Sequence, residues 1–196
     1  GSILFGLLAF GINFALLYWG LLQVPAAMAS VSFSNVPLVT FFLATALSME
    51  KFRWQGLAGA LLYLLCVVVI FSEQLKFNVP LLSMLAILVA VFCAALSGIV
   101  VKRMPKTNPI SVNAVGMTIG AMILLAISLV GGETKLLPTL NTTWWALGWL
   151  VTSSFGAFVL MVWVLSRWSA SATAYTSVLS PLVSVVAAAW LAGEMI

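Results

Sequence analysis

The sequence predicts an all-α, polytopic membrane protein, a helical bundle built from two inverted repeats. Hydrophobic residues make up 64% of the 196 residues and charged residues only 6%, whereas a soluble domain carries about 25% charged residues. Apolar stretches of roughly 20 residues, enough to cross a bilayer as a helix, recur between short polar segments. A signal peptide does not account for so many of them.

Polar or helix-breaking residues separate these stretches and set the limits of each element. Glu50-Lys51-Phe52-Arg53 ends the second helix, and residues Glu73 to Pro80 separate the third from the fourth. Lys102 to Lys106 breaks the fourth from the fifth, and Pro109 is typical of a helix start. Gly131-Gly132-Glu133 ends the fifth. We therefore expect seven helices, at Ile3–Leu22, Pro25–Ser48, Trp54–Phe71, Leu81–Val101, Ile110–Val130, Trp144–Leu165 and Ala170–Leu191.

The distribution of positive charge predicts the orientation of these helices. All connections are short, so sequential helices should run antiparallel. The loops after the second, fourth and sixth helices hold six basic residues, and the other loops hold only Lys76 and Lys135. The positive-inside rule places the six-charge side in the cytoplasm. Those six residues are Lys51, Arg53, Lys102, Arg103, Lys106 and Arg167.

The second half of the chain repeats the first half. Trp19 to Glu50 aligns with Trp163 to Glu194 at a constant offset of 144, with nine identities that include Pro-Leu-Val and the final Glu. The charge pattern puts Glu50 at the cytoplasmic end of its helix and Glu194 at the outer end of its own. A duplicated membrane unit with opposed orientations is typical of a secondary transporter. We expect a partial first repeat at 1–74 and a partial inverted second repeat at 75–196.

An inverted repeat needs an odd number of helices per copy, because only then does the second copy enter the membrane from the other side. Five per copy fits the offset, which predicts a parent of ten helices with two before Gly1 and one after Ile196.

Several motifs resemble the EamA-type branch of the drug/metabolite transporter superfamily. In the first copy these are Tyr18-Trp19-Gly20-Leu21, Ser34-Asn35-Val36-Pro37-Leu38-Val39 and Leu47-Ser48-Met49-Glu50. In the second copy they are Leu179-Ser180-Pro181-Leu182 and Leu191-Ala192-Gly193-Glu194. The resemblance implies export or exchange of small metabolites, often amino acids, through a central cavity between the repeats.

Pro37 and Pro181 each lie near the middle of a predicted helix, where proline removes a backbone hydrogen bond and frees a carbonyl. In lipid, that carbonyl needs a protein partner or a water-filled cavity. Small polar residues around the prolines can line such a cavity or join helices to one another, and the buried amide of Asn35 has four hydrogen-bonding positions to satisfy. The candidate substrate-cavity residues are Asn13, Trp19, Ser32, Ser34, Asn35, Pro37, Trp163, Thr173, Tyr175, Ser177, Ser180 and Pro181.

Other spacings predict structure rather than chemistry. Gly116-x-x-x-Gly120, Ala94-x-x-x-Gly98 and Gly56-x-x-Gly59 permit close helix approach.

The charged residues restrict the function further. The chain has no histidine and only four acidic residues, so we expect no metal site, no cofactor and no enzyme activity, and no feature favours nucleic acid. No ionisable residue lies mid-span, which predicts an uncharged, apolar and aromatic cavity suited to amino acids or amphipathic compounds. A nucleotide-sugar or sugar-phosphate exchanger, a membrane enzyme acting on lipid and a non-transporting scaffold subunit remain alternatives. The expected partners are a small-molecule substrate and the lipid bilayer of a bacterial or archaeal cytoplasmic membrane, with a homodimer left open.

Overall fold

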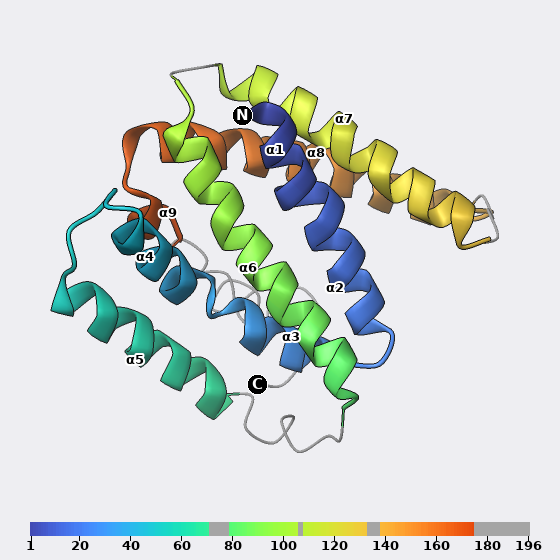
Figure 1. Ribbon diagram of the computed structural model, residues 1–196. Coiled ribbons are helices and arrows are strands. Elements are labelled where there is room, and N and C mark those ends of the chain that lie inside the picture. Colours follow the sequence, from blue (N-terminus) through green and yellow to red (C-terminus); the bar gives the residue numbers. More distant parts are fainter. Residues whose placement is uncertain (71–78, 106–107, 133–137, 175–196) are drawn as a thin grey trace.

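The computed structural model of the protein describes residues 1–70, 79–105, 108–132 and 138–174 (Figure 1). It confirms the predicted all-α, polytopic bundle, and each of the seven expected segments contains helix. Five helical stretches among the described residues are long and apolar enough to cross a membrane: Ser2–Leu21, Met28–Ala46, Leu81–Arg103, Pro109–Val130 and Asn141–Arg167. Sequential helices alternate in direction (Figure 1).

The first span is continuous but not uniformly α-helical. α1 (Ser2–Gly6) passes into the π-helix η1 (Leu7–Ile12) and then into α2 (Asn13–Leu21). Asn13 begins α2 with its amide Nδ2 donating to the Ala9 carbonyl, 3.2 Å away. Short π segments are rare within α-helices, and η1 packs against α6 and α7.

The second span differs from the expectation of one helix at Pro25–Ser48. It consists of α3 (Ala26–Phe33) and α4 (Val36–Ala46), joined by a turn at Ser34 and Asn35. The N–H of Asn35 donates to the carbonyl of Ser32, three residues earlier, at 3.1 Å. In an α-helix the acceptor would be the carbonyl four residues earlier. Pro37 lies in the first turn of α4. Backbone N–H groups in a first turn have no partner within the helix, so the N–H that proline lacks costs no helical hydrogen bond. The proline therefore starts a new helix and does not kink a continuous one.

The next helix is α5 (Trp54–Ile70), which packs against α4 and α3. After it comes α6 (Leu81–Arg103), the central helix of the bundle. α6 crosses the middle of Figure 1 with α2 on one side and α4 on the other, and it contacts α1, η1, α3, α8 and α9 as well. Helices of the two predicted repeats therefore pack against each other directly.

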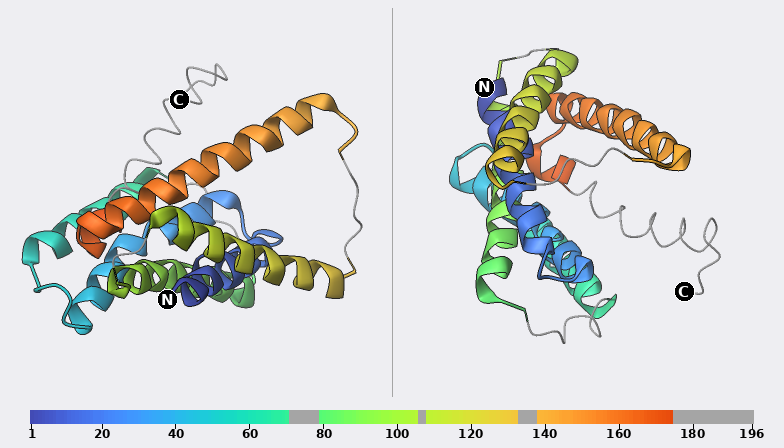
Figure 2. Two further views of the ribbon diagram at one scale, coloured as in Figure 1. Left: turned by 90° about the horizontal axis from the view of Figure 1, so that it is seen from above. Right: turned by 90° about the vertical axis from the view of Figure 1, so that its right-hand side faces the viewer.

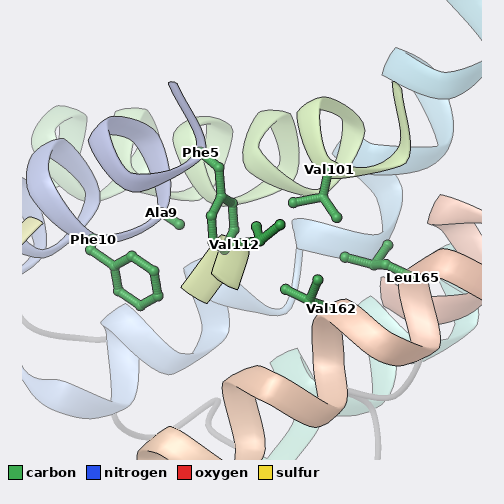
Figure 3. Packing of buried hydrophobic residues seen from close by; sticks show 7 residues of the cluster. All are labelled: Phe5, Ala9, Phe10, Val101, Val112, Val162 and Leu165. Atoms are coloured by element: carbon green, nitrogen blue, oxygen red, sulfur yellow. The ribbon is translucent and has the colours of Figure 1, made fainter. Parts of the chain in front are cut away.

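α7 (Pro109–Val130) packs closely on α1 and η1 through glycines. A Cβ added at Gly6 would lie 2.5 Å from the Gly116 carbonyl oxygen, and one added at Gly120 would collide with the Phe10 side chain. The close approach predicted from Gly116-x-x-x-Gly120 is confirmed. An apolar cluster extends this contact from η1 to α6 and α8 (Figure 3). Its buried members are Phe5, Ala9, Phe10, Val101, Val112, Val162 and Leu165.

α8 (Asn141–Arg167) is the longest helix described, and it stands apart from the bundle over most of its length (Figure 2). Its buried residues, Val162 and Leu165, lie near its C-terminal end. α9 (Ala170–Ala174) follows at once and turns back into the bundle. The end of α8 and the start of α9 thus belong to the core.

Candidate functional site

Three helices end at one side of the bundle, on the left in Figure 1, and hydrogen bonds join these ends. At the end of α6, Lys102 Nζ donates to the carbonyl oxygens of Leu165 (3.2 Å) and Trp168 (2.6 Å), which terminate α8. The adjacent Arg103 donates through Nη2 to the Leu47 carbonyl at the end of α4 (3.2 Å). A cation beside the last carbonyls of a helix satisfies acceptors that have no partner within that helix.

An acidic residue completes this set of contacts. Glu50, just beyond α4, accepts a hydrogen bond at Oε1 from the backbone N–H of Ser171 in the first turn of α9 (3.1 Å). Negative charge is favourable where a helix presents unpaired N–H groups. The ends of α4, α6 and α8 and the start of α9 therefore form one connected layer, which we call the polar end layer: Leu47, Glu50, Lys102, Arg103, Leu165, Trp168 and Ser171.

A cavity of about 110 Å³ lies inside this layer, where α4, α6, α8 and α9 meet. Two hydroxyl residues, one from each predicted repeat, are among its lining residues: Thr40 of α4 and Thr173 of α9, each 3% exposed. The Thr173 hydroxyl donates to the Ser169 carbonyl four residues back, at 3.0 Å. The remaining described lining is apolar and mostly small, and none of these described residues is charged. It consists of Val36, Ala94, Ala95, Gly98, Met161, Leu165, Ala170 and Ala174.

α4 and α9 run in opposite directions at this cavity. Ala170, at the start of α9, packs in one buried cluster with Ala44, near the end of α4. Further along α9, Thr173 and Ala174 line the cavity with Thr40 and Val36, which lie earlier in α4. Pro37 is buried on α4 between these two residues.

A second, larger cavity of about 560 Å³ lies beside the polar end layer. Unlike the first, its lining includes charged side chains, those of Glu50, Lys51 and Arg53. Phe41 and Ser171 also line it, whereas their near neighbours Thr40 and Thr173 line the inner cavity. The α4–α9 contact therefore separates an inner apolar space from an outer charged one.

Hydrogen bonds within a helix occupy several of the predicted site residues. The hydroxyls of Ser32 and Ser34 donate to the carbonyls four residues back, of Met28 and Ser30 (2.9 Å each). Asn35 donates through Nδ2 to the Ser32 carbonyl (3.1 Å), so its amide supports the end of α3 beside the turn.

Asn13 is 8% exposed, and its Oδ1 is buried without a hydrogen-bond partner among the described residues. It is the first residue of α2 and is not among the described residues that line the inner cavity.

The two predicted tryptophans lie on exposed surface of the described structure. Trp19 is 44% exposed, and Trp163 is 42% exposed with the Arg167 guanidinium carbon 4.1 Å from its ring centroid. Of the predicted set, the structure thus brings Thr173 to the inner cavity and Pro37 next to it. Tyr175, Ser177, Ser180 and Pro181 fall outside the described residues.

Two of the lining residues that were not predicted as site residues are Thr40 and Gly98. Thr40 was visible only as the partner of Ser184 in the internal repeat, a position where both copies carry a hydroxyl. Gly98 was interpreted as a helix contact, but a Cβ added there meets no atom of the described residues within 4 Å. In the part of the chain that the structure describes, no cluster of His, Cys, Asp or Glu could hold a metal ion.

Comparison with known families identifies this architecture. The EamA-like transporter family matches the chain in two stretches, residues 1–72 and 81–196. No curated protein matches it significantly. The chain belongs to the EamA-like transporter family and is a membrane transporter of the drug/metabolite transporter superfamily.

Proposed function

We propose that this transporter moves small, uncharged or zwitterionic amphipathic solutes, amino acids among them, by alternating access around the inner cavity. The observation that carries the proposal is the pair of hydroxyls, Thr40 and Thr173, on opposed helices of an otherwise apolar space. Hydroxyls can donate and accept, so they can orient an amide, amine or carboxyl group without a fixed charge. A phosphorylated substrate would favour Lys or Arg, and the described lining has neither.

The antiparallel course of α4 and α9 supports the mechanism. In secondary transporters with inverted repeats, the site lies between the repeats and access alternates as one repeat rocks against the other. The inner cavity lies between α4 of the first predicted repeat and α6, α8 and α9 of the second. The polar end layer would close this cavity on one side, which the positive charges favour as the cytoplasmic side.

A scaffold without a solute path would have a dry, fully packed centre. Protein interiors hold few voids larger than a water molecule, and a cavity of about 110 Å³ with two hydroxyls among its lining residues departs from that rule. The centre of this bundle therefore favours transport over a purely structural role.

The test is flux through the purified protein in proteoliposomes, against a panel of amino acids, amphipathic amines and a sugar phosphate. Thr40→Val and Thr173→Val keep the side-chain shape and remove the hydroxyls. We expect each to reduce flux of a transported solute about tenfold, because a buried polar group left unpaired costs roughly 1–3 kcal/mol. Thr118→Val is the matched control, since Thr118 is exposed on α7 and bonds its own helix at the Ala114 carbonyl.

Three outcomes would contradict the proposal. They are flux no greater than in empty liposomes for every solute, transport of the sugar phosphate alone, and equal flux in Thr40→Val and wild type.

A further inference from the structure

Gly98 differs from the other glycines in the core of this protein. It lies within α6 and is buried, yet a Cβ built on it meets no atom within 4 Å. At Gly6, Gly116 and Gly120 a Cβ would come within 3 Å of a neighbouring helix. Those glycines permit helix contact, and Gly98 does not.

Backbone conformation does not require glycine at this position either. Gly98 is helical, and among the described glycines only Gly132 has a positive φ. Glycine inside a helix is less favourable than alanine by about 1 kcal/mol. What glycine preserves at position 98 is therefore empty volume.

That volume is the inner cavity, which Gly98 lines together with Ala94 one turn earlier on α6. The cavity lining also includes Thr40 of α4, which is 3% exposed. A hydroxyl can donate and accept a hydrogen bond, so in an otherwise apolar lining it can orient a polar group of a bound solute. An empty volume at Gly98 and a hydroxyl in the same lining together fit a small bound solute.

We propose that Gly98 determines the size of the solute that this transporter accepts, by leaving room for the apolar part of the solute while Thr40 binds a polar group. The inference rests on the proposed function and deepens it. The cavity of about 110 Å³ suits a compact group. The expected ligand class is small amphipathic molecules with at least one hydrogen-bonding group.

The first test is a graded series, Gly98→Ala, Gly98→Val and Gly98→Leu, assayed in proteoliposomes against alanine, valine, leucine and phenylalanine. We expect each enlargement to exclude the larger accepted solutes first, by about tenfold or more for each methylene-sized volume that is lost. The size limit should fall step by step while flux of the smallest solute changes least. Gly148→Leu is the matched control, because Gly148 is exposed on α8 and a Cβ there also meets no atom within 4 Å.

The second test does not depend on knowing the solute. Gly98→Cys is made in a background with Cys66→Ala and Cys93→Ala, and labelling by a small and by a bulky methanethiosulfonate reagent is followed by mass spectrometry. We expect the small reagent to react and the bulky one to be excluded, and a transported solute to slow the small reagent.

The two tests separate failure of this inference from failure of the proposed function. If the wild type moves no solute while Gly98→Cys reacts as expected, the proposed transport function is wrong, but the labelling still supports an accessible cavity at position 98. Equal size limits across the Gly98 series in an active transporter, uniform loss of flux for every solute, or no labelling of Gly98→Cys would each overturn the role of Gly98.

Discussion

Glu50 accepts a hydrogen bond from the backbone N–H of Ser171, 121 residues further along the chain, at 3.1 Å. This bond joins the end of α4 to the start of α9, and so joins the two stretches that match the transporter family. It holds together the helices that line the inner cavity.

Glu50→Ala should destabilise the protein by about 1 kcal/mol, the typical cost of losing an acceptor at a helix start. Glu50→Gln should cost less, because the amide oxygen still accepts while the charge is lost. Thermal unfolding in detergent micelles measures both variants. Gln55→Ala serves as control, since Gln55 is exposed in the lining of the same outer cavity. Equal thermal stability of Glu50→Ala and wild type would show that the hydrogen bond between Glu50 and Ser171 does not contribute to the stability of the protein.

Lys102→Met should lower the free energy of unfolding by about 1 kcal/mol, because two carbonyls at the end of α8 lose a charged donor. Lys51→Met removes the same charge from an exposed residue on the same side and should change stability little. Unfolding of both variants in mixed micelles tests this difference. The prediction fails if the two substitutions have the same effect.

Asn113→Leu should loosen the contact between α7 and α8. Asn113 is fully buried, and its Nδ2 donates to the carbonyls of Phe158 (3.1 Å) and Pro109 (3.0 Å). Interhelical hydrogen bonds in membranes contribute about 0.6 kcal/mol on average, and the Phe158 carbonyl would lose this donor.

The measurement for Asn113 is the distance between spin labels placed on α7 and α8, together with thermal stability. We expect a broader distance distribution in Asn113→Leu than in wild type. Thr118→Val is again the control on the same helix. An unchanged distribution would mean that the apolar cluster alone positions α8.

Gly116→Val should be strongly destabilising, because added side-chain atoms would meet the Phe5 ring and the backbone of Gly6. Overpacking of a tight contact costs about 1–3 kcal/mol or more. Gly156→Val on α8 meets open space and should be tolerated. Yield of folded monomer in size-exclusion chromatography compares the two, and similar yields would contradict the close approach of α1 and α7.

Local signals allowed most of the helices to be predicted. α7 begins at Pro109 and ends at Val130, as its proline and the following glycines indicated. α6 ends at Arg103, among the basic residues expected to terminate it. These signals depend on a residue and its immediate neighbours, so the sequence contains them in full.

The features that sequence reasoning missed depend on contacts between distant residues. The break at Ser34 and Asn35 arises because a side-chain amide and a proline combine to end one helix and begin another. The empty space at Gly98 exists only because α4, α8 and α9 stop short of it. A glycine that permits contact and a glycine that preserves a cavity have the same appearance in a sequence.

The interruption at Ser34 and Asn35 divides one membrane crossing into two helices, α3 and α4. No α-helical hydrogen-bond ladder runs unbroken through Ser34 and Asn35, so a change of angle there breaks few helical bonds. α3 packs on α5 and α6, whereas α4 also packs on α9. The two halves of this crossing therefore have different neighbours, and the half that packs on α9 at the inner cavity is α4.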